Sequence, residues 1–442
     1  MLILQSNSRD DYMKRDAYEK LLAWKRNPDR KPLILKGARQ VGKTWLMEEF
    51  GKTEYKSYVL LNFDEEEELR SIFETNKNPH RIIERLGLLH GEKIMPGETL
   101  IVFDEIQECP AALNSLKYFM EQANDYHVIA AGSLLGTLLA KPKSYPVGKV
   151  NLLEIHPLTY GEFLAASDEP LYAYLMQVKK DQPIEEIFHN RLLEAYSNYL
   201  IIGGLPECVS SWIKYKDPGK IRQIHEELVS FYENDFSKHN GDINAGRILM
   251  VFRSIVSQLG KPNAKFIYGC IKPGARAREF EEAIEWLVSA GLFHRVNNVT
   301  KPEHPLRAFA DTSYFKVFLF DTGLLKHMAG IDNSAILLKS NYQFKGPLTE
   351  NFVLQQLQGQ FEVEPHLYFD GRGEIDFMLQ KGMEIIPVEV KGGEDKSAAS
   401  FKAYIKYRDP QTAIRYSKRG YVTDGHITNI PLYLACITDK LI

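Results

Sequence analysis

The chain has 442 residues, of which 44% are hydrophobic and 11% aromatic, and its formal net charge is −3 at pH 7. This length predicts roughly two to four domains, and the composition is that of a folded globular chain rather than a disordered one. The near-neutral charge excludes a global electrostatic argument for nucleic-acid binding, so such an argument must depend on local patches.

The cysteines and the hydropathy pattern indicate the compartment. Four cysteines are scattered, without a C-x-x-C pair or a histidine at ligand spacing, as is typical of reduced thiols. The N-terminus has no basic segment followed by a long apolar run, and no stretch approaches the ~18 apolar residues of a membrane span. We therefore expect a cytoplasmic protein without a membrane partner.

The first 157 residues alternate between buried strands and helices. Strands are expected at residues 32–36, 58–63, 99–103, 126–131 and 150–155, and helices at 13–27, 45–50, 80–90 and 111–123. Apolar strands separated by helices predict a parallel sheet covered on both faces.

The loop after the first strand fits the pattern G-x-x-x-x-G-K-[S/T]. It reads Gly37-Ala38-Arg39-Gln40-Val41-Gly42-Lys43-Thr44. The backbone N–H groups of such a loop, and the helix N-terminus after it, bind the phosphates of a nucleotide. In this pattern Lys43 contacts the β- and γ-phosphates and Thr44 is a ligand of Mg²⁺, while Arg39 and Gln40 either touch phosphate or only brace the loop. The octapeptide predicts an ATP site.

Two acids end the third strand, sixty residues after Thr44. Asp104 is placed to bind Mg²⁺ through its water shell, and Glu105 to polarise the water that attacks the γ-phosphate. The pair distinguishes a nucleotide hydrolase from a passive nucleotide binder. Ser133 follows the next strand and is either a sensor of the γ-phosphate or a simple turn residue.

The pattern changes after residue 157. Residues up to 240 are rich in helices, with a break at residues 202–207. Residues 245–300 hold three helical periods, and a helix stop at Ala290-Gly291 precedes a strand at residues 292–296. Helices closed by a small hairpin suggest a winged helix.

Four residues in the last hundred form a second candidate site. Glu350 lies in the helical stretch 348–357, and Asp376 lies in the strand 373–379 on the face opposite to Ile375, Phe377 and Leu379. Glu389 and Lys391 are two apart in the next strand and share a face. A helical acid, a strand aspartate and E-x-K in this order resemble the PD-(D/E)xK nuclease fold.

That resemblance implies metal-dependent cleavage of nucleic acid. Asp376 and Glu389 would bind Mg²⁺, which activates a water and neutralises the phosphate. Lys391 would orient that water or stabilise charge, and Glu350 would complete the metal shell or position a base. Ile375 stands where the fold's hallmark proline is expected, and such folds also serve as inert scaffolds, so active and inactive domains both remain open.

A wider set of motifs resembles a large prokaryotic family of AAA-type ATPases whose C-terminal domain, of unknown function, is often described as nuclease-like. The motifs are the octapeptide, residues 103–107, 131–133, 155–163, 203–207 and 320–325, and the C-terminal acids. The resemblance implies this architecture for nearly the whole chain. Family members often show Gly-Arg where this chain has Gly148-Lys149. If that arginine assists hydrolysis, Lys149 is a weaker substitute, because the planar guanidinium is replaced by the point charge of an ammonium group.

We expect an α/β fold with four parts. They are a P-loop ATPase domain (1–157) with a parallel sheet, a helical lid (158–240), a winged-helix-like domain (241–335) and a restriction-endonuclease-like domain (336–442). Residues 391–420 hold eight Lys/Arg against three Asp/Glu, and residues 261–310 eight against five. These segments are compatible with DNA or RNA contact and equally with ordinary solvated helices.

The predicted function is a Mg²⁺-dependent ATPase that uses ATP to change conformation or assembly on nucleic acid, with a nuclease-like C-terminal domain. The alternative is a nucleotide-gated signalling or oligomerisation switch with an inert interaction domain. A homo-oligomer fits both. Candidates for an arginine that acts across its subunit boundary are Arg276, Arg278 and Arg415, with nothing in the sequence to choose between them.

Overall fold

The structure is a computed structural model that describes residues 13–75, 77–132, 148–238, 245–261, 265–338, 342–392 and 399–442. The chain divides into two compact units. The N-terminal unit consists of Arg15–His156 together with Trp286–Leu292. The C-terminal unit consists of Pro157–Glu285 and Phe293–Ile442, with the segment up to Lys14.

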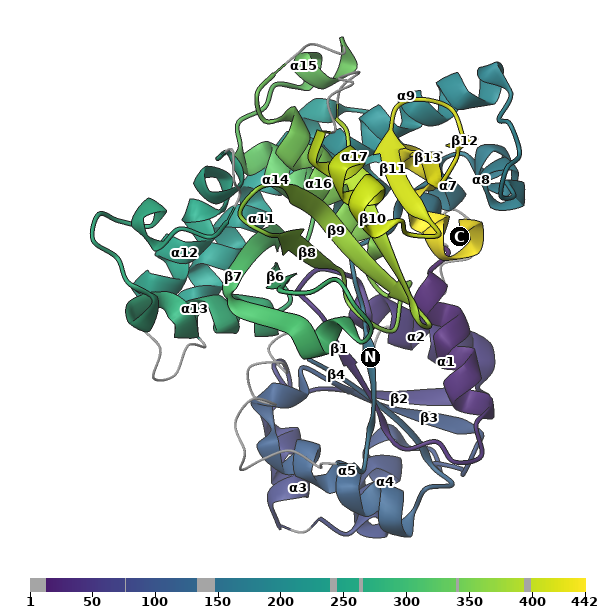
Figure 1. Ribbon diagram of the computed structural model, residues 1–442. Helices are drawn as coiled ribbons and strands as arrows, with labels where there is room; N and C mark the ends of the chain where they lie inside the picture. The colour runs from purple at the N-terminus through teal and green to yellow at the C-terminus, as the bar shows by residue number, and fades with distance from the viewer. Residues whose placement is uncertain are drawn as a thin grey trace. The chain divides into compact units, whose positions relative to one another are not determined.

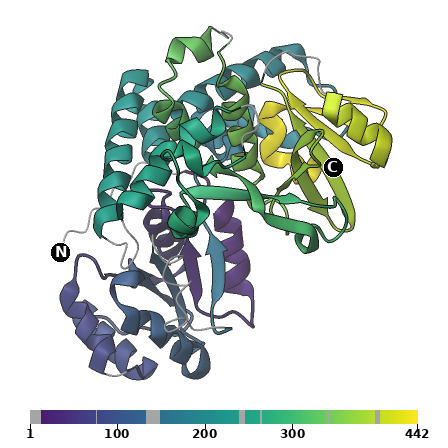
Figure 2. The same cartoon turned by 60° about the vertical axis from the view of Figure 1, so that its left-hand side comes forward.

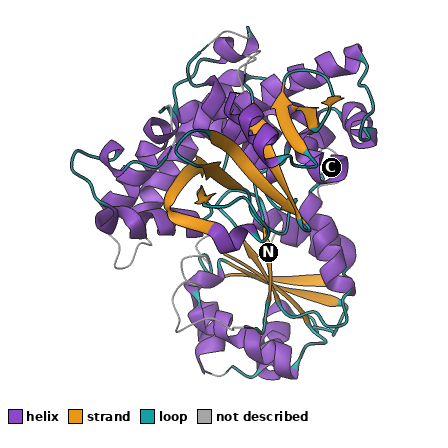
Figure 3. Cartoon of the chain, viewed as in Figure 1, coloured by secondary structure: helices purple, strands orange, loops and turns teal. Residues whose placement is uncertain are grey.

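The N-terminal unit is built on a five-stranded parallel sheet with the order β2-β3-β4-β1-β5 (Figures 1 and 3). Its strands are β1 (Leu33–Lys36), β2 (Ser57–Asn62), β3 (Thr99–Asp104), β4 (His127–Gly132) and β5 (Asn151–Glu154). Its helices are α1 (Asp16–Arg26), α2 (Lys43–Glu54), α3 (Arg70–Thr75), α4 (Pro79–His90) and α5 (Pro110–Gln122), with short 3-10 turns at Glu67–Leu69 and Ile106–Glu108. The alternation expected from the sequence is therefore present.

Helices cover both faces of this sheet. Helix α2 packs on strands β2, β3 and β4 with α1 beside it, and α3, α4 and α5 lie on the other face (Figure 1). Strands β3 and β4 are buried along their whole length, as their continuous apolar sequences predict.

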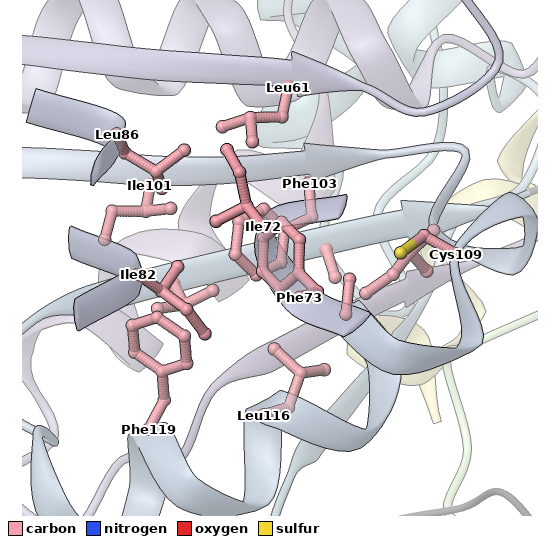
Figure 4. Close-up of a cluster of buried hydrophobic side chains, with 14 of the residues drawn as sticks. Leu61, Ile72, Phe73, Ile82, Leu86, Ile101, Phe103, Cys109, Leu116 and Phe119 are labelled. Atoms are coloured by element: carbon pink, nitrogen blue, oxygen red, sulfur yellow. The ribbon is translucent and has the colours of Figure 1, made fainter. Parts of the chain in front are cut away.

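An aromatic cluster fixes the end of β3 (Figure 4). The ring of Phe73 on α3 meets Phe63 and Phe103 edge to face, with centroids 5.4 and 5.3 Å apart. Such pairs contribute about 0.5–1.5 kcal/mol each beyond their buried area. Because Phe103 immediately precedes Asp104, the core holds this acid at the sheet's edge.

The strand order brings three segments to one edge. β4 pairs with β1 on one side and with β3 on the other, as the partners Leu35–Ala131 and Phe103–Ala130 show. All the strands are parallel, so the loop after β1, the acids after β3 and the end of β4 lie at the same edge of the sheet, where ligands of open α/β sheets bind.

The C-terminal unit combines helices with an eight-stranded mixed sheet in the order β12-β13-β11-β10-β9-β8-β6-β7. Its strands are β6 (Phe293–Val299), β7 (Ala310–Leu319), β8 (His366–Phe369), β9 (Glu374–Lys381), β10 (Glu384–Val390), β11 (Ala413–Ser417), β12 (Val422–Asp424) and β13 (Ile427–Pro431).

Its helices before the sheet are α7 (Tyr160–Ser167), α8 (Glu169–Gln177), α9 (Glu186–Ile202), α10 (Pro206–Tyr215), α11 (Pro218–Lys238), α12 (Ala245–Leu259) and α13 (Ala277–Ser289). Its later helices are α14 (Thr322–Met328), α15 (Asn333–Leu337), α16 (Lys345–Leu357), α17 (Ala399–Arg408) and α18 (Thr438–Leu441). Short 3-10 turns span Tyr268–Cys270, Leu306–Phe309 and Leu432–Ile437. Helix α16 packs on β7 and β10, and α17 packs on β9 (Figures 1 and 2).

The hairpin of β6 and β7 continues the C-terminal sheet. β6 pairs antiparallel with β7, as expected for a hairpin, and also parallel with β8 at Asn298 and Leu367. The Asn298 side chain strengthens this joint, because its Oδ1 accepts a hydrogen bond of 2.8 Å from the Phe369 N–H. The sheet thus runs across the boundary expected at residue 335, and the division of the chain into four domains stays a prediction.

A register shift in β9 reverses part of the expected face pattern. Between β8 and β9 the pairing shifts so that two residues of β9, Asp376 and Phe377, lie opposite one residue of β8, Leu367. Ile375 therefore packs in one cluster with Met378, while Phe377 packs against Phe318 of β7, with ring centroids 5.8 Å apart. The expectation that Ile375, Phe377 and Leu379 share a face was wrong, because a bulge adds one residue and changes the alternation.

Candidate functional site

The loop between β1 and α2 has the backbone conformation that its glycines permit. Gly42, at the start of α2, has φ +87°, and Gly37 has φ +149°. A Cβ on Gly37 would lie 2.2 Å from the Ile155 carbonyl oxygen, so no larger residue fits. Gln40 also has positive φ, at +63°, a conformation that costs free energy in a non-glycine residue and is frequent at ligand sites.

Lys43 lies inside this loop. Its Nζ donates hydrogen bonds to the carbonyl oxygens of Gly37 (2.9 Å) and Ala38 (2.7 Å), and the residue is 7% exposed. Burial lowers the pKa of Lys43 to about 8, although the charges of Glu105 and Asp104 act in the opposite direction. A buried ammonium group that costs stability is suited to an anionic ligand, because phosphate charge would offset that cost.

Thr44 and Asp104 are in direct contact. The Thr44 hydroxyl donates a hydrogen bond of 2.6 Å to Asp104 Oδ2, and the Glu105 N–H donates one of 3.0 Å to Oδ1 of the same carboxylate. Burial raises the pKa of Asp104, and the bond from Thr44 partly offsets this. A hydroxyl and a carboxylate at the phosphate loop are the oxygen donors that Mg²⁺ takes, so this pair fits the cation.

The backbone of Glu105 is strained, because a non-glycine residue here has a left-handed conformation. Its φ is +46°, in the left-handed region, at the turn that follows β3. Its Oε2 accepts a hydrogen bond from Gln107 Nε2, so Gln107 fixes the direction of the carboxylate. The sequence motif at residues 103–107 contained Gln107, but no role was predicted for it.

Arg15 is a second residue without a predicted role. Its guanidinium donates hydrogen bonds to the carbonyl oxygens of Val41 in the loop (2.9 Å) and of His156 (2.7 Å), and it is 5% exposed. Arg15 lies at the start of α1, outside any motif, and a single arginine there carries no sequence signal of this contact.

The remaining predictions around the nucleotide loop have different outcomes. Arg39 is half-buried and close enough to Lys43 for its charge to lower that lysine's pKa. Ser133 lies outside the described residues. Lys149 forms an ion pair of 3.0 Å with Glu121 on α5. In the C-terminal unit, Arg276 and Arg278 are exposed on the surface.

In the C-terminal unit, all four predicted residues meet, and two unpredicted ones join them. Lys316 of β7 places its Nζ 3.5 Å from Glu350 Oε2 and forms an ion pair with Glu374. Lys391 pairs with Glu389. We call this set the carboxylate cluster; its members are Lys316, Glu350, Glu374, Asp376, Glu389 and Lys391.

Asp376 is half-buried, whereas Glu389 is only 6% exposed. The ladder between β9 and β10 ends at Phe377 and Val388, and beyond it Asp376 Oδ2 accepts a hydrogen bond of 2.7 Å from the Val390 N–H. Burial raises the pKa of Asp376 well above its usual range, and the charges of Glu350 and Glu389 add to this.

The geometry of the cluster does not present a metal site. Among the residues that the structure describes, no group of three or more His, Cys, Asp or Glu side chains is arranged to hold a metal ion. Arg415 lies in register with Glu389 on the neighbouring strand, and its Nε and Nη2 are buried without a hydrogen-bond partner in the described part of the chain. The roles of Asp376 and Glu389 as metal ligands stay predictions.

No helix in the described part of the chain is both long enough and apolar enough to span a bilayer.

Three family models match separate parts of the chain. Residues 29–164 match the family model of an AAA domain. Residues 193–335 match a domain of unknown function (DUF8612), and residues 345–434 match another (DUF4143). No curated protein matches the chain.

Solved structures resemble the chain at low sequence identity. A Walker-type ATPase of Pyrococcus abyssi is 15% identical, with a TM-score of 0.47 over 72% of this chain and 97% of that one. Cdc6p from Pyrobaculum aerophilum is 12% identical, with a TM-score of 0.28 over 76% and 97%. A signal-transduction ATPase with a tetratricopeptide repeat sensor from Pyrococcus horikoshii is 11% identical, with a TM-score of 0.27 over 80% and 46%.

Residues 29–164 thus form an AAA-type P-loop domain, and the match supports ATP binding and hydrolysis. The models that match the rest of the chain carry no function, so they do not support a nuclease.

Proposed function

We propose that the chain is a Mg²⁺-dependent ATPase that couples ATP hydrolysis to conformational change or assembly on nucleic acid. The observation that supports it best is the contact of 2.6 Å between Thr44 and Asp104, with Glu105 next in sequence and Lys43 inside the phosphate loop. A passive nucleotide binder has no need of the strained, hydrogen-bonded carboxylate at position 105.

Each residue has a role that follows from its place. The backbone of residues 37–44 binds the phosphates, and Lys43 leaves its carbonyl partners to neutralise them. Thr44 and Asp104 would hold Mg²⁺, which would supply charge neutralisation and orientation of the phosphates. Glu105, directed by Gln107, accepts hydrogen bonds from the attacking water and polarises it.

Two substitutions test the ATPase. Glu105→Gln keeps the shape of the side chain and its contact with Gln107, so ATP binding should persist while turnover falls by about 100-fold or more. Lys43→Ala should lose both binding and turnover. Turnover is measured as phosphate release and binding by fluorescent ATP titration, with Lys36→Ala, at the half-exposed ion pair with Glu154, as the matched control. Parental turnover in Lys43→Ala excludes this site.

Nucleic acid as the target is supported by local charge. Three basic residues of α17 (Lys402, Lys406 and Arg408) are exposed on one helix, where they suit contact with a phosphate backbone. ATP turnover should therefore rise on addition of at least one form from a panel of single- and double-stranded DNA and RNA. If turnover is unchanged while self-association follows ATP, the signalling or oligomerisation switch is the better description.

For the C-terminal unit, the two alternatives are a metal-dependent nuclease and an inert, nuclease-like interaction domain. The meeting of Glu350, Asp376, Glu389 and Lys391 supports a nuclease-like arrangement. The ion pairs that occupy these side chains favour the inert alternative. Mg²⁺-dependent cleavage of DNA or RNA that disappears in Asp376→Ala would decide for the nuclease.

A further inference from the structure

We propose that the ammonium group of Lys316 is the built-in cation of the carboxylate cluster, and that removing it allows a divalent metal ion to bind there. This inference rests on the inert alternative for the C-terminal unit and is independent of the ATPase. It concerns a residue that no sequence motif contains.

The burial of Lys316 requires partners of opposite charge. The side chain is 2% exposed in a strand whose neighbours, Phe315 and Val317, are buried apolar residues. A buried lysine is rare unless paired, because an isolated ammonium loses several kcal/mol of hydration. Here it is paired with Glu350 of α16 and Glu374 of β9, so one ammonium joins two elements that are far apart in the sequence.

The partners of Lys316 are the oxygen donors that a divalent cation would use. Glu350 and Glu374 bind it directly, and the charge of Asp376 acts on it as well. Carboxylate oxygens are the donors that Mg²⁺ and Mn²⁺ prefer, and two of them contact the ammonium. While the Lys316 ammonium lies between Glu350 and Glu374, a metal ion would have to displace a buried charge that is already paired with two carboxylates.

The other acids of the cluster are occupied in the same way. Glu389 pairs with Lys391, and Asp376 accepts the N–H of Val390. Every carboxylate in the cluster therefore has a protein partner. Removal of Lys316 alone leaves Glu350 and Glu374 without a cation, and a hard divalent ion is the ligand that restores the balance.

The test measures Mn²⁺ binding by the nucleotide-free, full-length chain, with free Mn²⁺ followed by electron paramagnetic resonance. The wild type and Lys316→Arg, which keeps the charge, should bind no Mn²⁺ at the cluster. Lys316→Met, which keeps the length and removes the charge, should gain a site about tenfold or more tighter than any in the wild type. The double variant Lys316→Met/Glu374→Gln should lose most of that gain.

Two results would overturn the proposal. One is a Mn²⁺ site in the wild type that Glu374→Gln abolishes, because the ammonium would then leave room for the metal. The other is folded Lys316→Met without a new site. If Lys316→Met is too unstable to purify, the wild type and Glu374→Gln decide: equal, weak Mn²⁺ binding supports the built-in cation, and stronger binding by the wild type contradicts it. ATP turnover, measured in parallel, separates this outcome from failure of the ATPase.

Discussion

The Thr44 hydroxyl and Asp104 Oδ2 are 2.6 Å apart, although the two residues are separated by sixty positions and by an intervening strand of the sheet. Thr44 belongs to the first turn of α2 and Asp104 ends β3. The contact joins the phosphate loop to the end of β3 at one edge of the sheet, where the cation site is proposed.

Asp104→Asn tests that site. The amide keeps an oxygen for the Thr44 hydroxyl but removes the charge that would hold Mg²⁺. We expect ATP turnover to fall by about 100-fold or more, with little loss of stability, because burial already disfavours the charged form. Phosphate release across a Mg²⁺ titration measures the effect, and Asp125→Asn, at an exposed acid of the same unit, is the control. Undiminished turnover would remove Asp104 from the mechanism.

Lys43→Met should stabilise the nucleotide-free chain. Burial lowers the pKa of Lys43 from 10.5 to about 8, so at pH 7 the folded state holds an ammonium group that the unfolded state solvates better. Removing the charge should raise the free energy of unfolding by about 1–3 kcal/mol. Lys36→Met, at the half-exposed pair with Glu154, should change it by less than about 1 kcal/mol. Chemical denaturation at pH 7 measures both, and a destabilised Lys43→Met contradicts the argument.

His225 should make the C-terminal unit sensitive to acid. Burial lowers the pKa of His225 to about 3, helped by neighbouring His327, and its Nε2 lies 3.2 Å from the Ile202 carbonyl oxygen. Below pH 6.5 the unfolded chain therefore binds a proton that the folded chain does not, so stability falls as the pH falls, by about 2 kcal/mol between pH 6.5 and 5. This part of the pH dependence of the free energy of unfolding should be missing in His225→Gln. It should be retained in His426→Gln, at an exposed histidine. Equal slopes in the two variants would be the contrary result.

Two glycines with positive φ separate backbone strain from steric clash. A Cβ at Gly203 (φ +77°) would lie 2.2 Å from Asp321 Oδ1, whereas one at Gly330 (φ +65°) would meet nothing within 4 Å. Asp321 cannot move away freely, because it also accepts the Gly204 N–H at 2.7 Å. Gly330→Ala should cost about 1 kcal/mol, and Gly203→Ala about 2–4 kcal/mol more. Denaturant unfolding of both variants gives the difference, and equal costs would mean that the loop relaxes.

The sequence was sufficient where function depends on a short segment. The octapeptide, the strand before it and the acids at the end of β3 are local patterns, and in the structure Thr44 contacts Asp104 and the charge of Asp104 acts on Lys43. Glu105 was named from the sequence, but its strained backbone was not predicted. A positive φ at a non-glycine position has no sequence signature.

The C-terminal unit shows where such reasoning fails. The pairing of β6 with β8 joins residues about seventy positions apart, and the bulge in β9 depends on that partner strand. Lys316 was not predicted, although the sequence carries a signal for it. A single lysine between Phe315 and Val317 in an apolar strand indicates a buried ammonium group, which needs an acid as its partner. Finding that acid required the fold, because Glu350 and Glu374 come from other elements.

The two hydrogen bonds of Arg15 have a mechanical consequence. One holds the Val41 carbonyl in the phosphate loop and the other holds His156, the last residue before the chain enters the C-terminal unit. A guanidinium is a flat, rigid fork, so the two carbonyls it holds cannot shift independently without breaking a bond. Through Arg15, a displacement of the phosphate loop is therefore coupled to a displacement of the peptide at His156, where the chain leaves the N-terminal unit.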